Sequence, residues 1–208
     1  VVVVVTPHLQ SQYPSDPVFP ALSEEQAVMP CAEAAPAASA ETRHYASAMA
    51  APSRSAGERL LSAWRALSGL PGGRFLFSCL VRWRIPYTGS VWPRVEMLEP
   101  GYARISIRQR RRLEQHLGSI HAIALANVAE FASGAAITTA LPAGYRGIVT
   151  RMNIEYFKKA RGIVTAEART TLPDLAVEAD HDFVSEVRDE AGDVVARAVV
   201  TWRLGPVR

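Results

Sequence analysis

The sequence predicts an α+β domain in which an antiparallel sheet wraps around one long central helix, with a helical extension before it. Three observations predict this class. Residues 122–137 are apolar on almost every side, which is typical of a helix buried all round. The segments on both sides of this helix alternate apolar and polar residues with a period of two, as half-buried strands do. Two such segments precede the helix and four follow it.

Three regions are predicted along the chain. Residues 1–52 are rich in Pro, Ala, Ser and Gln without sustained periodicity, and we expect a disordered, low-complexity tail. Its opening run of valines is too short for a signal-peptide core and lacks a basic flank. Residues 53–91 are expected to form a helical flank or lid, and residues 92–208 the main domain.

The flank is predicted to hold two helical elements. Residues 55–68 carry leucines and a tryptophan at helical spacing, with Ser55 and Glu58 placed as a capping box. Residues 74–85 form a second amphipathic element that ends before Pro86. We interpret the aromatic residues of the flank as core packing, with the lining of a pocket as the alternative; they are Trp64, Phe75, Phe77 and Trp83.

The strands of the main domain follow from the same alternation. Residues 95–99 and 102–108 are predicted to pair as a hairpin. After the central helix, four strands are predicted, the last two joined by a Glu-Ala-Gly-Asp turn; they span residues 148–157, 162–170, 180–189 and 194–204.

One acidic residue inside the central helix is the main candidate for chemistry. Glu130 lies in an otherwise apolar stretch, with His121 at the start of the helix. A carboxylate in such a place is costly unless it is paired, hydrogen-bonded or used. The structural alternative is a buried carboxylate that bonds to Asn127 or Ser133.

The strand order, together with the segment HLGSIHA, Glu130 nine residues after its second His, and Ser133–Gly134, resembles the hotdog fold of acyl-CoA thioesterases. The resemblance covers residues 92–204 and is greatest to the phenylacetate-pathway (PaaI-like) branch, especially its uncharacterised members. It implies hydrolysis of an acyl-CoA thioester by a homodimer or tetramer. Coenzyme A would enter as part of the substrate, and no further cofactor is required.

The resemblance also implies roles for single residues. In such enzymes, backbone N–H groups just after the His hold the thioester carbonyl oxygen, which here gives Ala122 and Ile123. Free N–H groups and the helix dipole favour a developing negative charge there. Glu130 would be the nucleophile or general base, and Gln115 would position water or the carbonyl. His121 is expected to order the loop rather than to act as a base.

Three positions depart from the usual pattern of this branch. Gln115 replaces Asn, Ala122–Ile123 replace a pair of glycines, and Gly134 stands where some relatives have Ser or Thr. Backbone donors and a carboxylate remain, so hydrolysis is still the main hypothesis. A non-catalytic acyl-CoA or lipid-binding module is the alternative. A hydratase or dehydratase is a third option, but the motif that carries the catalytic His of those relatives is not found.

Helix geometry predicts that the site needs two chains. Nine helical positions turn through about 900° and rise about 13.5 Å, so Glu130 faces away from His121. One chain cannot easily bring both to a single carbonyl. Two antiparallel central helices can, each offering its first turn to the Glu130 of the other, which predicts a composite site across a twofold interface.

A basic turn is the candidate site for the phosphates of coenzyme A. Lys158 and Lys159 stand next to Arg161 and Gly162, with Arg151 upstream. Cations beside a glycine can hold phosphates, and the resemblance places this turn near the nucleotide. The alternative is an exposed basic turn that aids solubility.

Other partners are not predicted. The formal net charge is only +3, and the arginine-rich residues 108–112 lack interleaved aromatics, so nucleic acid is not expected. We interpret that run as a solvated turn that could also face the anionic cofactor. No metal is expected, because Asp180 and Asp182 share one strand face while His181 points to the other.

The sequence favours a cytoplasmic protein. Cys31 and Cys79 have no metal or redox spacing, which agrees with a reducing compartment. Every apolar run long enough to cross a membrane has a polar interruption, so no membrane insertion is expected; the longest contains Glu130.

Overall fold

The computed structural model describes residues 2–5 and 54–207. Its main sheet has the strand order β1-β6-β9-β8-β7-β3-β2. All neighbours in it are antiparallel except β1, which runs parallel to β6. The strands of this sheet are β1 (Val2–Val5), β2 (Arg94–Glu99), β3 (Tyr102–Arg108), β6 (Tyr145–Tyr156), β7 (Ile163–Arg169), β8 (Ala179–Asp189) and β9 (Val194–Pro206).

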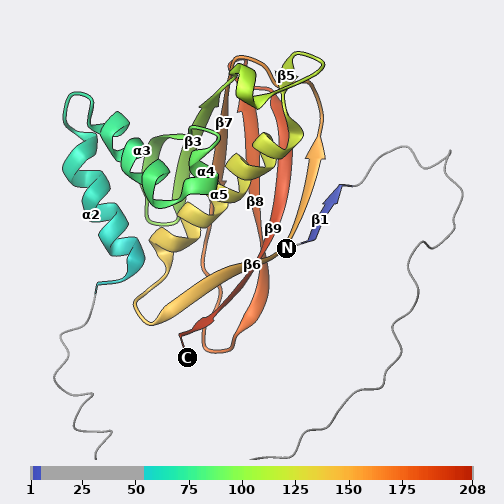
Figure 1. The fold of residues 1–208 in the computed structure, drawn as a ribbon. Coiled ribbons are helices and arrows are strands. Elements are labelled where there is room, and N and C mark those ends of the chain that lie inside the picture. The colour runs from blue at the N-terminus through green and yellow to red at the C-terminus, as the bar shows by residue number, and fades with distance from the viewer. Residues whose placement is uncertain (1, 6–53, 208) are drawn as a thin grey trace, which may run out of the picture. The chain divides into compact units, whose positions relative to one another are not determined.

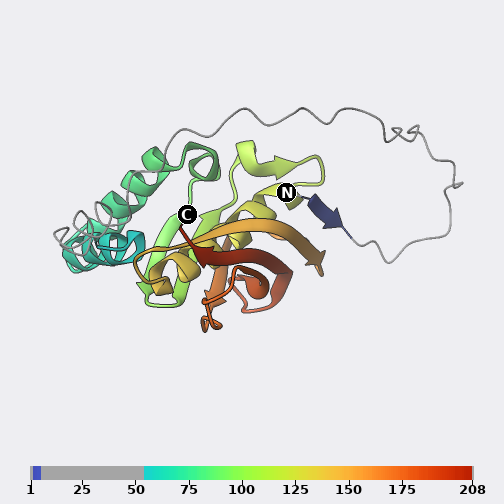
Figure 2. The same ribbon diagram turned by 90° about the horizontal axis from the view of Figure 1, so that it is seen from below.

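The central helix α5 (Ala122–Ala140) lies in the hollow of this curved sheet (Figures 1 and 2). Its small buried side chains, such as Ala132 and Ala136, let the helix approach the strands closely. The facing strands contribute fully buried branched residues, including Ile105, Val164 and Val200. This is the predicted hotdog architecture, and it explains why the helix shows no polar stripe.

Among the described residues, α5 is the one helix that is long and apolar enough to cross a membrane. Most of its apolar stretch, 67%, is buried inside the protein. It is therefore the core helix of the domain.

The helical flank contains α2 (Ala56–Ser68), α3 (Gly73–Arg84) and the short α4 (Pro86–Gly89). The predicted capping box of α2 is present, with Ser55 Oγ accepting the N–H of Glu58. Trp64 and Phe77 pack edge to face in the core, with ring centroids 5.1 Å apart.

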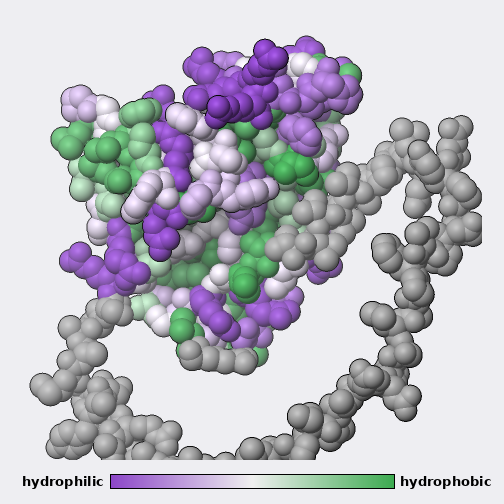
Figure 3. Space-filling view, in the orientation of Figure 1, coloured by the Kyte–Doolittle hydropathy of each residue, from purple (hydrophilic) through white to green (hydrophobic). Residues whose placement is uncertain are grey.

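Core packing was the wrong prediction for the other two aromatic residues of the flank. Phe75 is 60% exposed and Trp83 is 80% exposed, because they lie on the side of α3 that faces away from α5. Exposed apolar side chains also gather over this part of the molecule in the space-filling view (Figure 3, upper left).

The structure contains elements that periodicity did not predict. Helix α4 and the hairpin of β4 (Glu114–Gln115) and β5 (Ser119–Ile120) are too short to show a period. Strand β1 pairs with residues 151–154 of β6, although it falls in the predicted tail. The prediction for the rest of that tail lies outside the described residues.

Candidate active site

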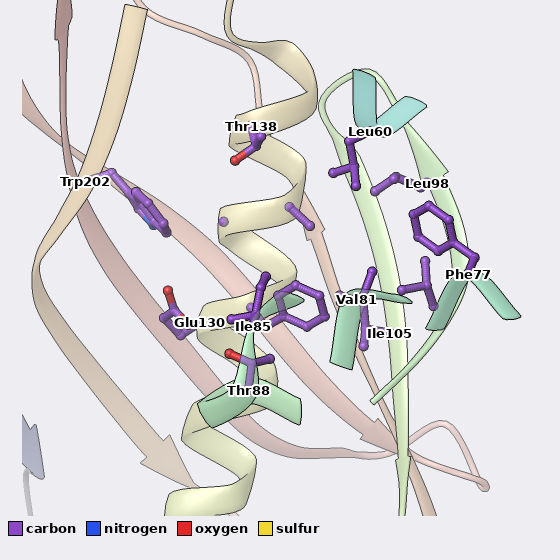
Figure 4. Close-up of a pocket in the computed structure, with 14 residues that line it drawn as sticks. Leu60, Phe77, Val81, Ile85, Thr88, Leu98, Ile105, Glu130, Thr138 and Trp202 are labelled. Carbon is purple, nitrogen blue, oxygen red and sulfur yellow. The ribbon is translucent and has the colours of Figure 1, made fainter. Parts of the chain in front are cut away.

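Two cavities lie beside α5 at different positions along its length. The first has a volume of about 250 Å³ and is lined by the flank, the sheet and the middle of α5, including Glu130 (Figure 4). The second has a volume of about 490 Å³ at the start of the helix. It brings together five predicted site residues, Gln115, His121, Ala122, Lys158 and Lys159. Within one chain, Glu130 is therefore separated from the other predicted catalytic groups.

Glu130 lies half-buried on an apolar surface. Within the described part of the chain, its carboxylate makes no hydrogen bond or ion pair, and burial raises its pKa. The hydroxyl of Ser133 donates to the backbone oxygen of Glu130 at 2.8 Å, not to its carboxylate. The Oδ1 atom of Asn127 is buried without a partner of its own in these residues. The bonds required by the structural alternative are thus not formed.

The absence of a hydroxyl at position 134 has a packing reason. A Cβ atom on Gly134 would lie 3.0 Å from two ring atoms of Trp202, so a side chain there would require the indole to shift by a few tenths of an ångström. Trp202 is held there by a hydrogen bond of 3.2 Å from its Nε1 to Ser133 Oγ. The indole therefore lies where a side chain at position 134 would begin.

Thr88, which sequence reasoning missed, supplies a hydroxyl near Glu130 instead. It is buried on α4, lines the Glu130 cavity and forms no side-chain hydrogen bond within the described residues. Figure 4 shows its side chain and that of Glu130 among those that line the cavity. Only Pro86, in the first turn of α4, marks this helix in the sequence, because Pro is favoured there.

The start of α5 differs from the predicted oxyanion hole. His121 is the N-cap residue, and its Nδ1 accepts the N–H of Ile123 at 3.1 Å. The predicted role of Ile123 is therefore not available in this structure, because its N–H is already bonded. The N–H of Ala122 makes no hydrogen bond within the described residues, so one of the two predicted donors remains.

Gln115 is tied to its own hairpin. Its Nε2 donates to Ser119 Oγ at 2.8 Å, and its Oε1 accepts the N–H of Leu117 at 3.1 Å. Tyr156 is a second residue that the sequence did not reveal. Its hydroxyl donates to the backbone oxygen of Ala122 at 3.0 Å, and burial raises the pKa of this hydroxyl. Gln115 thus shapes the loop that leads to α5, and Tyr156 fixes the first turn of the helix.

The predicted phosphate-binding residues divide into two groups. Lys158 forms ion pairs with Asp189 at 2.7 Å and Asp193 at 2.6 Å, and the hydrogen bond to Asp189 raises its pKa. Lys159 lines the same cavity and has no ion pair within the described residues. Lys159 is therefore the better placed cation for an incoming phosphate.

The other three predicted phosphate-binding residues do not line the cavity at the start of α5. Arg161 Nε donates to the Gly118 oxygen at 3.3 Å, and the Gly162 N–H donates to Gln109 Oε1 at 2.9 Å. Arg151 lies in the middle of β6. The structure therefore does not gather the five predicted residues into one binding site.

The residues that resemble a metal cluster in the sequence are engaged in other bonds. Asp180 forms an ion pair with Arg203, and Asp182 accepts the hydroxyl hydrogen of Thr201. Within residues 2–5 and 54–207, no group of three His, Cys, Asp or Glu side chains could hold a metal ion.

Comparisons with known proteins identify the family and agree with the fold. Residues 73–204 match the model of a family described as a domain of unknown function (DUF4442). No curated protein matches the chain. The crystal structure of a structural-genomics target is similar, with 30% identity and a TM-score of 0.63, and the match covers 72% of this chain and 99% of that one.

Two further solved structures are named as thioesterases. A protein of unknown function from Pseudomonas aeruginosa, described as a probable thioesterase, is 28% identical with a TM-score of 0.59, over 66% of this chain and 97% of that one. A thioesterase from Staphylococcus aureus is 16% identical with a TM-score of 0.52, over 58% of this chain and 99% of that one. Its structures include variants in which a glutamine or a glutamate is replaced by alanine.

Proposed function

Because the chain belongs to the DUF4442 family and shares the hotdog fold with thioesterases, we propose that it hydrolyses acyl-CoA thioesters. One observation carries the proposal. Glu130 is a half-buried carboxylate without a partner in the described residues, and it lies beside an apolar cavity. An unpaired carboxylate of raised pKa next to space for an acyl group suits a general base or nucleophile better than a structural role.

In the proposed reaction, the acyl chain enters the Glu130 cavity and the thioester carbonyl lies between Glu130 and a helix start. The Ala122 N–H donates to the carbonyl oxygen and stabilises the negative charge that develops there. As a base, Glu130 takes a proton from water, whose oxygen attacks the carbonyl carbon. The C–S bond then breaks, and the coenzyme A sulfur leaves and receives the proton from Glu130. As a nucleophile, the Glu130 carboxylate would attack the carbonyl carbon, and the C–S bond would break to release the coenzyme A thiolate. Water would then hydrolyse the resulting anhydride to the free acid and the Glu130 carboxylate.

The helix start in this reaction would come from a second copy of the chain. Glu130 and Ala122 line different cavities in one protomer. Two copies could approach along β6, since α3 packs against β2 at the other edge of the antiparallel sheet. A homodimer is the smallest assembly that completes the site, and a tetramer would pair two such dimers. Lys159 would contact the nucleotide phosphates of the bound coenzyme A.

Two details support the proposed site and the proposed cytoplasmic location. In the Staphylococcus aureus thioesterase, the replaced glutamine and glutamate are separated by as many positions as Gln115 and Glu130 are here. The thiol of Cys79 is free, which agrees with the reducing cytoplasm that we infer for the protein.

A specific observation favours a second candidate, a non-catalytic acyl-CoA or lipid-binding module. The Ile123 N–H is bonded to His121, which leaves one backbone donor instead of two for the thioester oxygen. A module of this kind would use the same cavity for the acyl chain without turning it over.

A thiol-release assay over a panel of acyl-CoA esters separates the two candidates. We expect hydrolysis by the wild-type protein and a loss of at least about a hundredfold in Glu130→Gln, with acyl-CoA binding retained. Glu99→Gln is the matched control, because Glu99 is exposed and does not line the cavity. Binding without turnover by the wild-type protein would favour the module, and wild-type rates in Glu130→Gln would refute the mechanism.

A further inference from the structure

A third concave surface, the arginine groove, lies on the face of the sheet opposite to α5. Strands alternate their side chains, so Val95 and Ile105 face the core while Arg94 and Arg104 face outward. Helix α3 closes one side of the groove, which has a volume of about 480 Å³. No residue of the proposed catalytic site lines it.

The groove carries an excess of positive charge. Six arginines line it against one acidic residue, Glu96; they are Arg74, Arg82, Arg94, Arg104, Arg108 and Arg110. Arg94 pairs with Glu96 at 3.4 Å, and Arg104 pairs with Glu167 at 3.1 Å. The other four arginines form no ion pair within the described residues. Like charges held at one concave surface repel each other and favour a bound anion.

Two of these unpaired guanidinium groups are held in place by aromatic rings. Arg82 lies 4.6 Å from the ring centre of Trp92 and 5.4 Å from that of Phe75. Arg110 lies 4.7 Å from the same Trp92 ring. Stacking of this kind fixes the plane of each guanidinium. Arg82 Nη2 also donates to Cys79 Sγ at 2.8 Å, and its other N–H groups and those of Arg110 remain for a ligand.

The backbone at Trp92 has an unusual conformation. Its φ angle is +56°, and it is the only residue other than glycine with a positive φ in the described chain. A bulky residue rarely adopts this conformation, and such exceptions cluster at binding and switch sites. Here the left-handed turn presents the indole to both arginines.

We propose that the arginine groove binds a chain of two or three phosphoryl groups carried by a small molecule. Guanidinium forks match phosphate oxygens, and several unpaired arginines suit a ligand with several negative charges. The volume is that of a small-molecule site. Nucleic acid is not favoured, because the Trp92 indole already stacks on arginines rather than offering a base a free platform. The proposal is independent of thioester hydrolysis.

Calorimetric titration of the full chain with sodium tripolyphosphate tests the proposal. We expect one binding event per chain, weakened at least about tenfold in Arg110→Gln and also weakened by added salt. Arg110 is the residue to change because it is exposed at the end of the groove, and circular dichroism verifies that the variant is folded. Arg65→Gln, on the exposed face of α2 and outside the groove, should bind like the wild-type protein.

Displacement experiments identify the small molecule that carries the phosphoryl groups, and other results would overturn the proposal. If coenzyme A displaces tripolyphosphate and ATP does not, the proposal is supported and coenzyme A is the source of the phosphates. If both displace it equally, the proposal is supported and the groove accepts nucleotides in general. Absence of binding, or equal weakening in Arg110→Gln and Arg65→Gln, would overturn it. Tighter binding of a single-stranded oligonucleotide than of tripolyphosphate would overturn the small-molecule assignment.

Discussion

At the scale of single residues, the environment of Glu130 links its chemistry to stability. Burial without a hydrogen-bond partner in the described residues raises the pKa of this carboxyl group. The same desolvation that makes the carboxylate a stronger base also makes it costly to keep ionised in the folded protein. In the proposed mechanism, Glu130 therefore trades stability for reactivity, as catalytic groups commonly do.

This cost predicts a pH-dependent effect of Glu130→Gln on folding. Because the folded-state pKa lies above the unfolded value, Glu130 stabilises the protein below the unfolded pKa and loses that contribution as pH rises through the folded pKa. Gln does not titrate. We expect the variant to gain stability relative to the wild-type protein as pH rises, reaching about 1 kcal/mol at pH 8.

Urea unfolding of both proteins at about pH 4 and about pH 8 measures this difference in the free energy of unfolding. The same difference at both pH values would show that the carboxyl group is not desolvated in solution.

Sequence reasoning found Glu130 because a charge in an apolar helix is visible without coordinates. It could not find Thr88 or Tyr156, since their relevance depends on contacts with distant segments. Nor could it foresee that the N–H of Ile123 bonds to His121, because that depends on one side-chain rotamer.

At the scale of elements, the flank helps to shape the Glu130 cavity, which is the proposed acyl site. Leu60 of α2, Phe77 and Val81 of α3 and Thr88 of α4 line one part of it, and α5 and the sheet line the rest (Figure 4). A cavity of about 250 Å³ lies just below the usual size range of small-molecule sites. We therefore expect a preference for acyl chains of medium length.

Filling this cavity should shorten the preferred substrate. Ala135→Leu adds three carbons to a buried position in the cavity wall, so we expect the chain-length optimum of kcat/KM to fall by roughly three carbons. Activity on the chain length that the wild-type protein prefers should fall by about tenfold. The assay is thiol release over a series of saturated acyl-CoA esters, with Ala63→Leu on the exposed face of α2 as the control. A uniform loss over all lengths would place the acyl chain elsewhere.

The elements themselves were largely predictable, since the long helix and six strands have clear periods. The two-residue strands β4 and β5 and the single turn α4 were not, because they are shorter than one repeat of any pattern. Those short elements carry Gln115 and Thr88, so local periodicity fails where the site is built.

At the scale of the whole molecule, the proposed dimer depends on the edge strand β6. In this structure β1 pairs with residues 151–154 of β6 and so occupies part of that edge. An exposed edge presents unpaired N–H and C=O groups to any strand that reaches it. In the proposed dimer, β1 and the second copy would compete for the same backbone groups.

Weakening β1 should therefore strengthen the dimer. Val3→Pro removes one backbone donor from β1 and disfavours its pairing with β6. We expect dimer dissociation in sedimentation experiments to require a several-fold lower protein concentration than for the wild-type chain. An unchanged or weaker dimer in Val3→Pro would show that β1 does not compete with the second copy.

The measurement that most directly tests the composite site is complementation between two inactive variants. Glu130→Gln removes the carboxylate, and Ala122→Pro removes the backbone N–H at the first helical position. Proline is tolerated there, and the extended backbone of His121 (ψ 140°) suits the residue before a proline. Each variant alone should be inactive, because every composite site of its homodimer lacks one partner.

Refolding the two variants together gives mixed dimers in which one of the two sites has both groups intact. We expect about a quarter of the wild-type thiol-release rate per protomer, since half of the dimers are mixed and each restores one site. A mixture that stays as inactive as either variant alone, although mass spectrometry shows that mixed dimers have formed, would contradict the account.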